Sequence, residues 1–94
     1  MSQAVARFGD KCTGHGCFPS RPNIEASGNV FVNGLGAQRV GDAYAAHCCV
    51  SCHDGVASSG SGHVFVNGRA LVRISDSVSC GSSVAEVSGS VFCS

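Results

Sequence analysis

SGNVFVNG at residues 27–34 and SGHVFVNG at residues 61–68 differ at one position, and this repeat decides the fold. Each copy continues through a short connection to an arginine and an aspartate, which in the first copy are Arg39 and Asp42. Val-Phe-Val is typical of a β-strand, and Asn-Gly is the preferred two-residue turn of a β-hairpin. The sequence therefore predicts two equivalent hairpins within one chain.

A third copy of the unit is divided between the two ends of the chain. Residues 88–93 read SGSVFC and match the first half of the unit, whereas residues 6–10 read ARFGD and match the second half. We therefore expect the two termini to lie side by side and to close a third hairpin. Three equivalent hairpins around a pseudo-threefold axis predict an all-β fold, formed by residues 1–94 as a single domain.

The composition agrees with short strands joined by tight turns and excludes several classes of function. Six basic and six acidic residues cancel, which argues against the clustered positive charge of a protein that binds nucleic acid. No apolar run approaches the roughly 20 residues of a membrane span. Residues 1–10 lack the basic and apolar regions of a secretory signal, so we expect synthesis in the cytoplasm.

Metal-binding residues follow the repeated aspartates at matching distances. They are His15, His47 and Cys80, and pseudo-symmetry would bring these side chains to one point on the axis. His53 lies nearby, in the loop after His47. Three imidazoles and one thiolate would fill the tetrahedral coordination of one structural Zn(II) per chain and stabilise a small fold directly. The sequence predicts His15, His47, His53 and Cys80 as ligands, with Cys52 as an alternative to one of them.

The other cysteines and the fourth histidine lie outside the predicted ligand set. The cysteines of the two long loops are Cys12, Cys17, Cys48 and Cys49. They could form disulfides outside the cell, remain buried thiols or help to hold a second metal ion. Cys93 stands where the other copies carry valine, which predicts a buried apolar thiol, and His63 is expected on the surface.

An arginine and an aspartate recur in register in all three units. The pairs are Arg7 with Asp10, Arg39 with Asp42, and Arg73 with Asp76. Exposed charge pairs of this kind contribute little to stability. We instead expect each pair to fix the turn that leads to a metal-binding loop, and we expect no catalytic use.

Motifs that would indicate other chemistry are weak. Residues 49–53 read CVSCH, the attachment pattern of c-type haem, but that attachment requires export and no signal is present. A CxxC redox pair would need a βαβ setting, and a serine hydrolase elbow, GxSxG, does not occur. The sequence therefore predicts a protein that is not an enzyme.

The repeated SGxVFVNG, the arginine and aspartate that follow it, and the His or Cys in each loop resemble PAAR-repeat proteins. Residues 14–16 (GHG) and 79–81 (SCG) resemble the metal-binding loops of that family. The Pro-Ala-Ala-Arg tetrapeptide itself is absent, and only its arginine is kept, as Arg7, Arg39 and Arg73. The resemblance implies a small cone with the metal site near its apex.

The resemblance also implies a function. Family members cap and sharpen a homotrimeric β-helical spike, either VgrG of type VI secretion or the central spike of a contractile phage tail. One chain would cap one trimer, contact the target membrane during penetration and be delivered outside the cell on the spike or the virion. Effector cargo would attach by contact. The residues alone leave an alternative, a small Cys-rich metal-binding or redox-sensing protein.

The strand residues of the repeat alternate between valine and phenylalanine. Because alternate residues of a strand face opposite sides, one set is expected to face the spike and the other the interior. From the sequence, either the valines or the phenylalanines could form the set that faces the spike.

Overall fold

The computed structural model describes residues 2–94, and in this part of the chain every regular element is a β-strand. The strands are β1 (Gln3–Ala4), β2 (Phe31–Val32), β3 (Leu35–Gly36), β4 (Ala43–Cys49), β5 (Ser51–Val56), β6 (Phe65–Val66), β7 (Arg69–Ala70) and β8 (Phe92–Cys93). They form four two-stranded antiparallel sheets. A helix long and apolar enough to cross a membrane is absent from the described residues.

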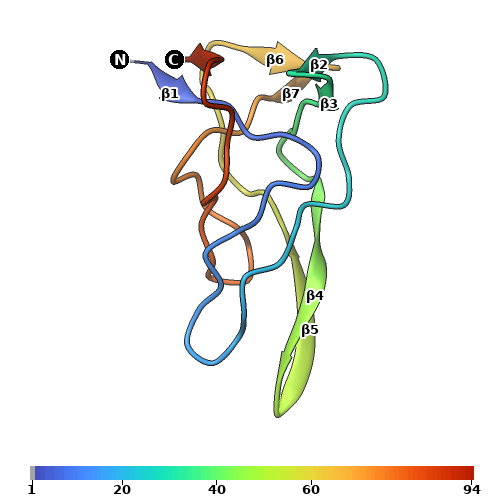
Figure 1. The fold of residues 1–94 in the computed structure, drawn as a ribbon, viewed down its shortest axis with the longest axis vertical. Helices are drawn as coiled ribbons and strands as arrows, with labels where there is room; N and C mark the ends of the chain where they lie inside the picture. Colours follow the sequence, from blue (N-terminus) through green and yellow to red (C-terminus); the bar gives the residue numbers. More distant parts are fainter. Residues whose placement is uncertain (1) are drawn as a thin grey trace.

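Three of these sheets are the repeated hairpins. β2 pairs with β3, β6 pairs with β7, and β1 pairs with β8 at the two ends of the chain. Asn33 and Asn67 both have a φ of 54° and are followed by glycines with positive φ, as a type I′ turn requires. The N- and C-terminal strands lie side by side (Figure 1). The predicted all-β fold, with one hairpin closed by the termini, is confirmed.

A closed ring of backbone hydrogen bonds joins the three units. The amide of Ala6 donates to the carbonyl of Val72 (2.9 Å), Val72 donates to Gln38 (3.0 Å), and Gln38 donates to Ala6 (3.1 Å). The same relation appears in three bridges between units, Arg7 with Ala37, Arg39 with Leu71, and Arg73 with Val5. Each unit thus pairs with the next and the last returns to the first, which is the pseudo-threefold symmetry that the repeat predicts.

The core consists of two small hydrophobic clusters. The cluster among the hairpins is formed by Val5, Val32, Ala37, Val66 and Leu71. The second is formed by Ala6, Cys12, Tyr44, Ala57, Val72, Val78 and Val84. The second valine of the repeat therefore faces the interior, as Val32 and Val66, whereas the phenylalanine before it faces outward. Cys93 packs against the first cluster but is only half-buried, contrary to the prediction and unlike Val32 and Val66 at the equivalent positions, because the chain ends one residue later and no Asn-Gly turn follows it. His63 is exposed, as predicted.

The molecule tapers from the hairpins toward the loops, with principal extents of 38 × 27 × 21 Å. Figure 1 shows the three hairpins and both termini at the broad end, and the loops that follow each aspartate at the narrow end. The β4–β5 ribbon reaches furthest. We call the end with the three hairpins the base and the end with the loops the tip. The expected cone is thus present, and one of its three loops is extended into a ribbon.

Candidate metal centre

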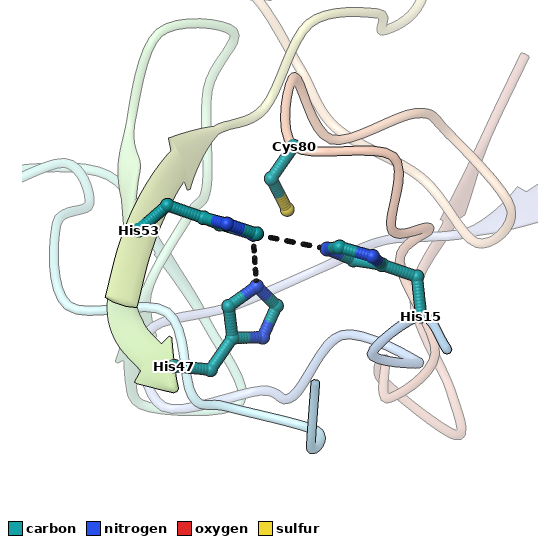
Figure 2. Close-up of side chains that lie close together, drawn as sticks. All are labelled: His15, His47, His53 and Cys80. Atoms are coloured by element: carbon teal, nitrogen blue, oxygen red, sulfur yellow. Dashed lines mark hydrogen bonds between the residues drawn. The ribbon is translucent and has the colours of Figure 1, made fainter. Parts of the chain in front are cut away.

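The four predicted ligands come together in the tip from three different segments. His15 lies in the first loop, His47 and His53 lie on β4 and β5, and Cys80 lies in the last loop. One ligand atom from each residue lies within 4.8 Å of all the others. Figure 2 shows the three imidazoles and the thiol converging on one point. Every repeat unit therefore contributes to a single cluster that could hold a metal ion.

The register of the β4–β5 ribbon places two of the histidines. His47 and His53 are directly opposed, and the register shifts between Tyr44 and His47, which marks a β-bulge. Directly opposed residues lie on one face of a sheet, and here the two Nε2 atoms are 2.7 Å apart. His15 reaches the same point from the first loop, with its Nε2 3.0 Å from that of His53.

The surroundings of His47 fix its tautomer. Its Nδ1 lies 2.8 Å from the carbonyl oxygen of Pro19. A carbonyl can only accept, so Nδ1 carries the hydrogen and Nε2 of the neutral ring is left with a lone pair directed at the cluster. A hydrogen bond from the second ring nitrogen to a backbone carbonyl is the usual arrangement of a metal-binding histidine.

The charge state of the cluster also suits a metal ion. Burial and the nearby charges of His47 and His53 lower the pKa of His15, which favours the neutral ring that binds metals. His53 Nε2 contacts both other rings yet has room for one hydrogen at most, so protons alone satisfy this cluster poorly. A cation that accepts the lone pairs of three imidazoles and a thiolate satisfies every member, so these residues fit a metal ion.

Phe18 covers the cluster and was missed by the sequence reasoning. Its ring centroid lies 4.8 Å from that of His15, 4.9 Å from that of His47 and 4.2 Å from that of His53. His15 and Phe18 exchange two backbone hydrogen bonds of 3.0 and 2.8 Å, which close a tight turn and hold the aromatic ring beside its ligand. The only signal for this role is an apolar aromatic residue close after a predicted ligand in an otherwise polar loop.

Gly55 makes room for the thiol of Cys80. A Cβ at this position would lie 3.0 Å from both Cβ and Sγ of Cys80 and 3.1 Å from Cγ1 of Val78. Such contacts are tighter than most between packed side chains, so any larger residue on β5 would require the last loop to shift away from the ribbon. This requirement also escaped the sequence reasoning, because it depends on how two distant segments meet.

The arginine–aspartate pairs hold the turns before the ligand loops. The three aspartates are nearly inaccessible, with exposures of 6%, 1% and 7% for Asp10, Asp42 and Asp76. Each accepts hydrogen bonds from the backbone amide and from the guanidinium of its own arginine. The expected structural role is thus supported, and the alternative of exposed charge pairs is wrong.

Asp42 has a second cationic partner. Its carboxylate lies 2.8 Å from Arg39 Nε and 2.7 Å from Arg69 Nη2. Burial on its own would raise the pKa of Asp42, but the hydrogen bonds and charge of Arg39, together with the charge of Arg69, hold it below its usual range. The turn before β4, which leads to His47 and His53 of the cluster, is therefore the most strongly paired of the three.

The cysteines divide into three groups. Disulfides join Cys17 to Cys49 and Cys48 to Cys52. Cys12 is a buried thiol, and Cys80 and Cys93 are free. Because Cys52 is bonded to Cys48, the alternative ligand set that used Cys52 is not formed, and the structure selects disulfides for the loop cysteines other than Cys12.

A family model described as the PAAR motif matches residues 13–86 of the 94-residue chain. The chain belongs to the PAAR-motif family. The matched range contains all four residues of the cluster. PAAR proteins are structural rather than catalytic, and this membership supports a spike-tip role in type VI and other contractile injection systems, in association with a spike protein. A search of curated proteins gave no match for this PAAR chain.

Proposed function

We propose that the chain is a zinc-stabilised tip that caps a homotrimeric β-helical spike, with one copy on each trimer. The observation that carries this proposal is the equal exposure of three equivalent phenylalanines at the base. Phe31, Phe65 and Phe92 are 60%, 59% and 55% exposed. A homotrimer presents three identical sites around its axis, and a single chain matches them only if it repeats one surface three times.

Side-chain hydrogen bonds also join the three units of the base. Three buried serines, one in each unit, accept a hydrogen bond from the backbone amide of the valine that precedes each phenylalanine. The serines are Ser27, Ser61 and Ser88, and all three hydrogen bonds are 2.9 Å long. Each of these hydroxyls also donates a hydrogen bond to an acceptor in a neighbouring unit. The acceptors are Oδ1 of Asn67 for Ser27, the carbonyl oxygen of Ser94 for Ser61, and Oδ1 of Asn33 for Ser88. The three phenylalanines are therefore presented on one interlocked frame.

Native mass spectrometry of a mixture with a homotrimeric spike protein tests the cap. We expect one copy of the chain on each trimer, and a complex of three copies on one trimer would contradict the proposal. The triple variant F31S/F65S/F92S should lose binding while it keeps its metal. Phe8→Ser is the matched control, because Phe8 is 48% exposed but lies outside the triplet.

The nature of the ligands supports zinc as the metal. Three imidazole nitrogens and one thiolate form a closed N/S set for a tetrahedral ion, which leaves no position for the water of a catalytic site. When bound, the ion would join segments from all three units and add to the free energy of unfolding. Elemental analysis should find about one zinc per folded chain. Folded protein that contains no bound metal would contradict this assignment.

If the base binds the spike, the tip of this chain is the leading end of the capped spike. We therefore propose that the chain leaves the producing cell on the spike or the virion and meets the target membrane first, with any effector cargo held by contact. The supporting feature is the taper away from the base (Figure 1). The chain should be found in the medium of cells whose injection machine contracts and not in that of sheath-deficient cells. Equal amounts in both media would contradict this route.

A further inference from the structure

The tip is cross-linked by two disulfides in addition to the candidate metal ligands. Cys17–Cys49 joins the loop of His15 to the ribbon of His47 and His53, which are separate units of the repeat. Cys48–Cys52 joins the ribbon only to itself, between directly opposed residues of β4 and β5. The two bonds therefore have different mechanical consequences, although they lie in the same ribbon.

The Cys17–Cys49 bond is attached immediately beside the cluster. Cys49 lies two residues after His47 on β4, so both residues belong to the same face of the strand. Cys17 lies in the turn between His15 and Phe18, the residue whose ring covers the imidazoles. This disulfide thus fastens the segment that supplies one candidate ligand and the aromatic cover.

The other bonds between this loop and the ribbon lie on one side of the turn. The carbonyl of Pro19 meets His47, Arg21 donates to the carbonyl of Ala46, and Ala45 donates to the carbonyl of Pro22. All three involve residues after Phe18. On the His15 side, the polar contact with the ribbon is the one between the imidazoles themselves. Without the disulfide, the His15–Phe18 turn is held to the ribbon by the cluster and by the Pro19 contact that follows it, while the amide of Gly14 donates to Ser82 of the last loop (2.8 Å).

We propose that Cys17–Cys49 is a redox latch on the metal centre. Closed, it keeps the His15–Phe18 turn against the ribbon and slows loss of the ion. Opened by a low-molecular-weight thiol, it lets the turn move away and speeds that loss. This inference rests on the proposed metal site, whose regulation it describes.

The chemistry of the latch is thiol–disulfide exchange. The thiolate of one small thiol attacks the sulfur of the exposed Cys17, which forms a mixed disulfide at Cys17 and releases Cys49 as a thiolate. A second small thiol attacks the mixed disulfide, which releases a small-molecule disulfide and the second cysteine. Two thiols are oxidised and one protein disulfide is reduced, a transfer of two electrons. In the reverse direction a small-molecule disulfide is the oxidant and closes the latch.

The rate of zinc transfer to an excess of a chromogenic chelator tests the latch. Zinc-loaded, oxidised protein is compared with the same protein in reduced glutathione, and with the double variants C17S/C49S and C48S/C52S. We expect reduction or C17S/C49S to speed transfer by about tenfold or more, given what a cross-link of separate segments contributes. C48S/C52S is the matched control and should keep both the slow rate and its sensitivity to glutathione.

Hydrogen exchange of metal-free protein separates the latch from the metal site. Reduction should speed amide exchange at residues 13–20 far more than at residues 27–36 of the base, whether or not zinc binds. If zinc binds in neither redox state, the proposed metal site fails and this exchange pattern alone decides the latch. Equal transfer rates in oxidised and reduced protein, or an exchange pattern unchanged by reduction, would overturn the latch. An effect reproduced in full by C48S/C52S would overturn it as well.

Discussion

The base and the tip of this molecule use one repeat in opposite ways. In the base the units are nearly identical, and hydrogen bonds between them form a closed ring without covalent links. In the tip the three loops differ. The first supplies His15, the second is a ribbon with His47 and His53, and the third supplies Cys80. Four candidate ligands from three loops cannot be symmetric, so a tetrahedral metal site of this kind would require that the tip depart from the symmetry that the base keeps.

Loss of a metal ligand should separate the two regions most strongly. Cys80→Ser removes the candidate thiolate and should lower the free energy of unfolding by several kcal/mol, about 5 or more, because zinc binding contributes directly to folding. Thermal melting with elemental analysis of the metal measures this. Cys93→Ser replaces a free, half-buried thiol of the base and should keep the zinc and most of the stability. Equal zinc content in the two variants would contradict the assigned ligand set.

The paired turn before the ribbon should give the next largest effect. Asp42→Asn removes a nearly inaccessible carboxylate and leaves the mostly buried Arg39 without its charged partner, which should cost about 3 kcal/mol of unfolding free energy, whereas Arg69 is 40% exposed and can turn to solvent. Asp54→Asn is the control, since Asp54 is exposed on β5. Chemical denaturation measures both. A cost for Asp54→Asn as large as that for Asp42→Asn would show that burial and pairing are not the cause.

The pH dependence of Asp42 has a defined sign. The pKa of Asp42 in the folded protein is below the unfolded value of about 3.9. Its contribution to the free energy of unfolding is therefore complete at pH values above the unfolded pKa and is lost as the pH falls through the lower pKa of the folded protein. Stability should therefore fall more gently on acidification in Asp42→Asn than in the native chain. Denaturation curves at several pH values below 5, measured on metal-free protein, check this.

A single methyl group tests the close packing of the tip. Gly55→Ala would place Cβ 3.0 Å from Sγ of Cys80. We expect a loss of about 2 kcal/mol from overpacking, together with weaker zinc binding. The same substitution in the base, Gly62→Ala, meets no atom within 4 Å and should be nearly neutral. Chemical denaturation and competition with a zinc chelator measure the two effects, and wild-type zinc affinity in Gly55→Ala would contradict the packing explanation.

The sequence predicted the base better than the tip, for a physical reason. Base contacts repeat, so aligning residues 27–34 with 61–68 and 88–93 shows which positions are equivalent, and equivalence fixes the hairpins and the axis. Three members of the candidate cluster, His15, His47 and Cys80, followed from the same symmetry, since loops after equivalent aspartates start from equivalent places, and His53 followed from its position shortly after His47. Phe18, Gly55 and the pairing of the cysteines did not follow. Each depends on where one particular loop meets another, which no repeated pattern encodes.

The smallest expected effect concerns the point of the tip. The ribbon reverses over Val50, which has a φ of 67° and is fully exposed. A positive φ is strained for a β-branched residue, and glycine removes that strain while adding freedom to the unfolded chain. Val50→Gly should therefore stabilise the oxidised protein by less than about 1 kcal/mol.

Val30→Gly in the base is the matched control for this reversal. Val30 is also exposed, but its φ is not positive, so glycine there brings only the entropic cost and should destabilise. The gain at Val50 should shrink in C48S/C52S, because the disulfide between the residues flanking the reversal is what holds the strained geometry. Chemical denaturation of the native chain, Val50→Gly, C48S/C52S and the combined variant V50G/C48S/C52S completes this double-mutant cycle. If Val50→Gly destabilises as much as Val30→Gly, the strain assigned to the tip is absent, and the contrast between a relaxed base and a cross-linked, strained tip is lost.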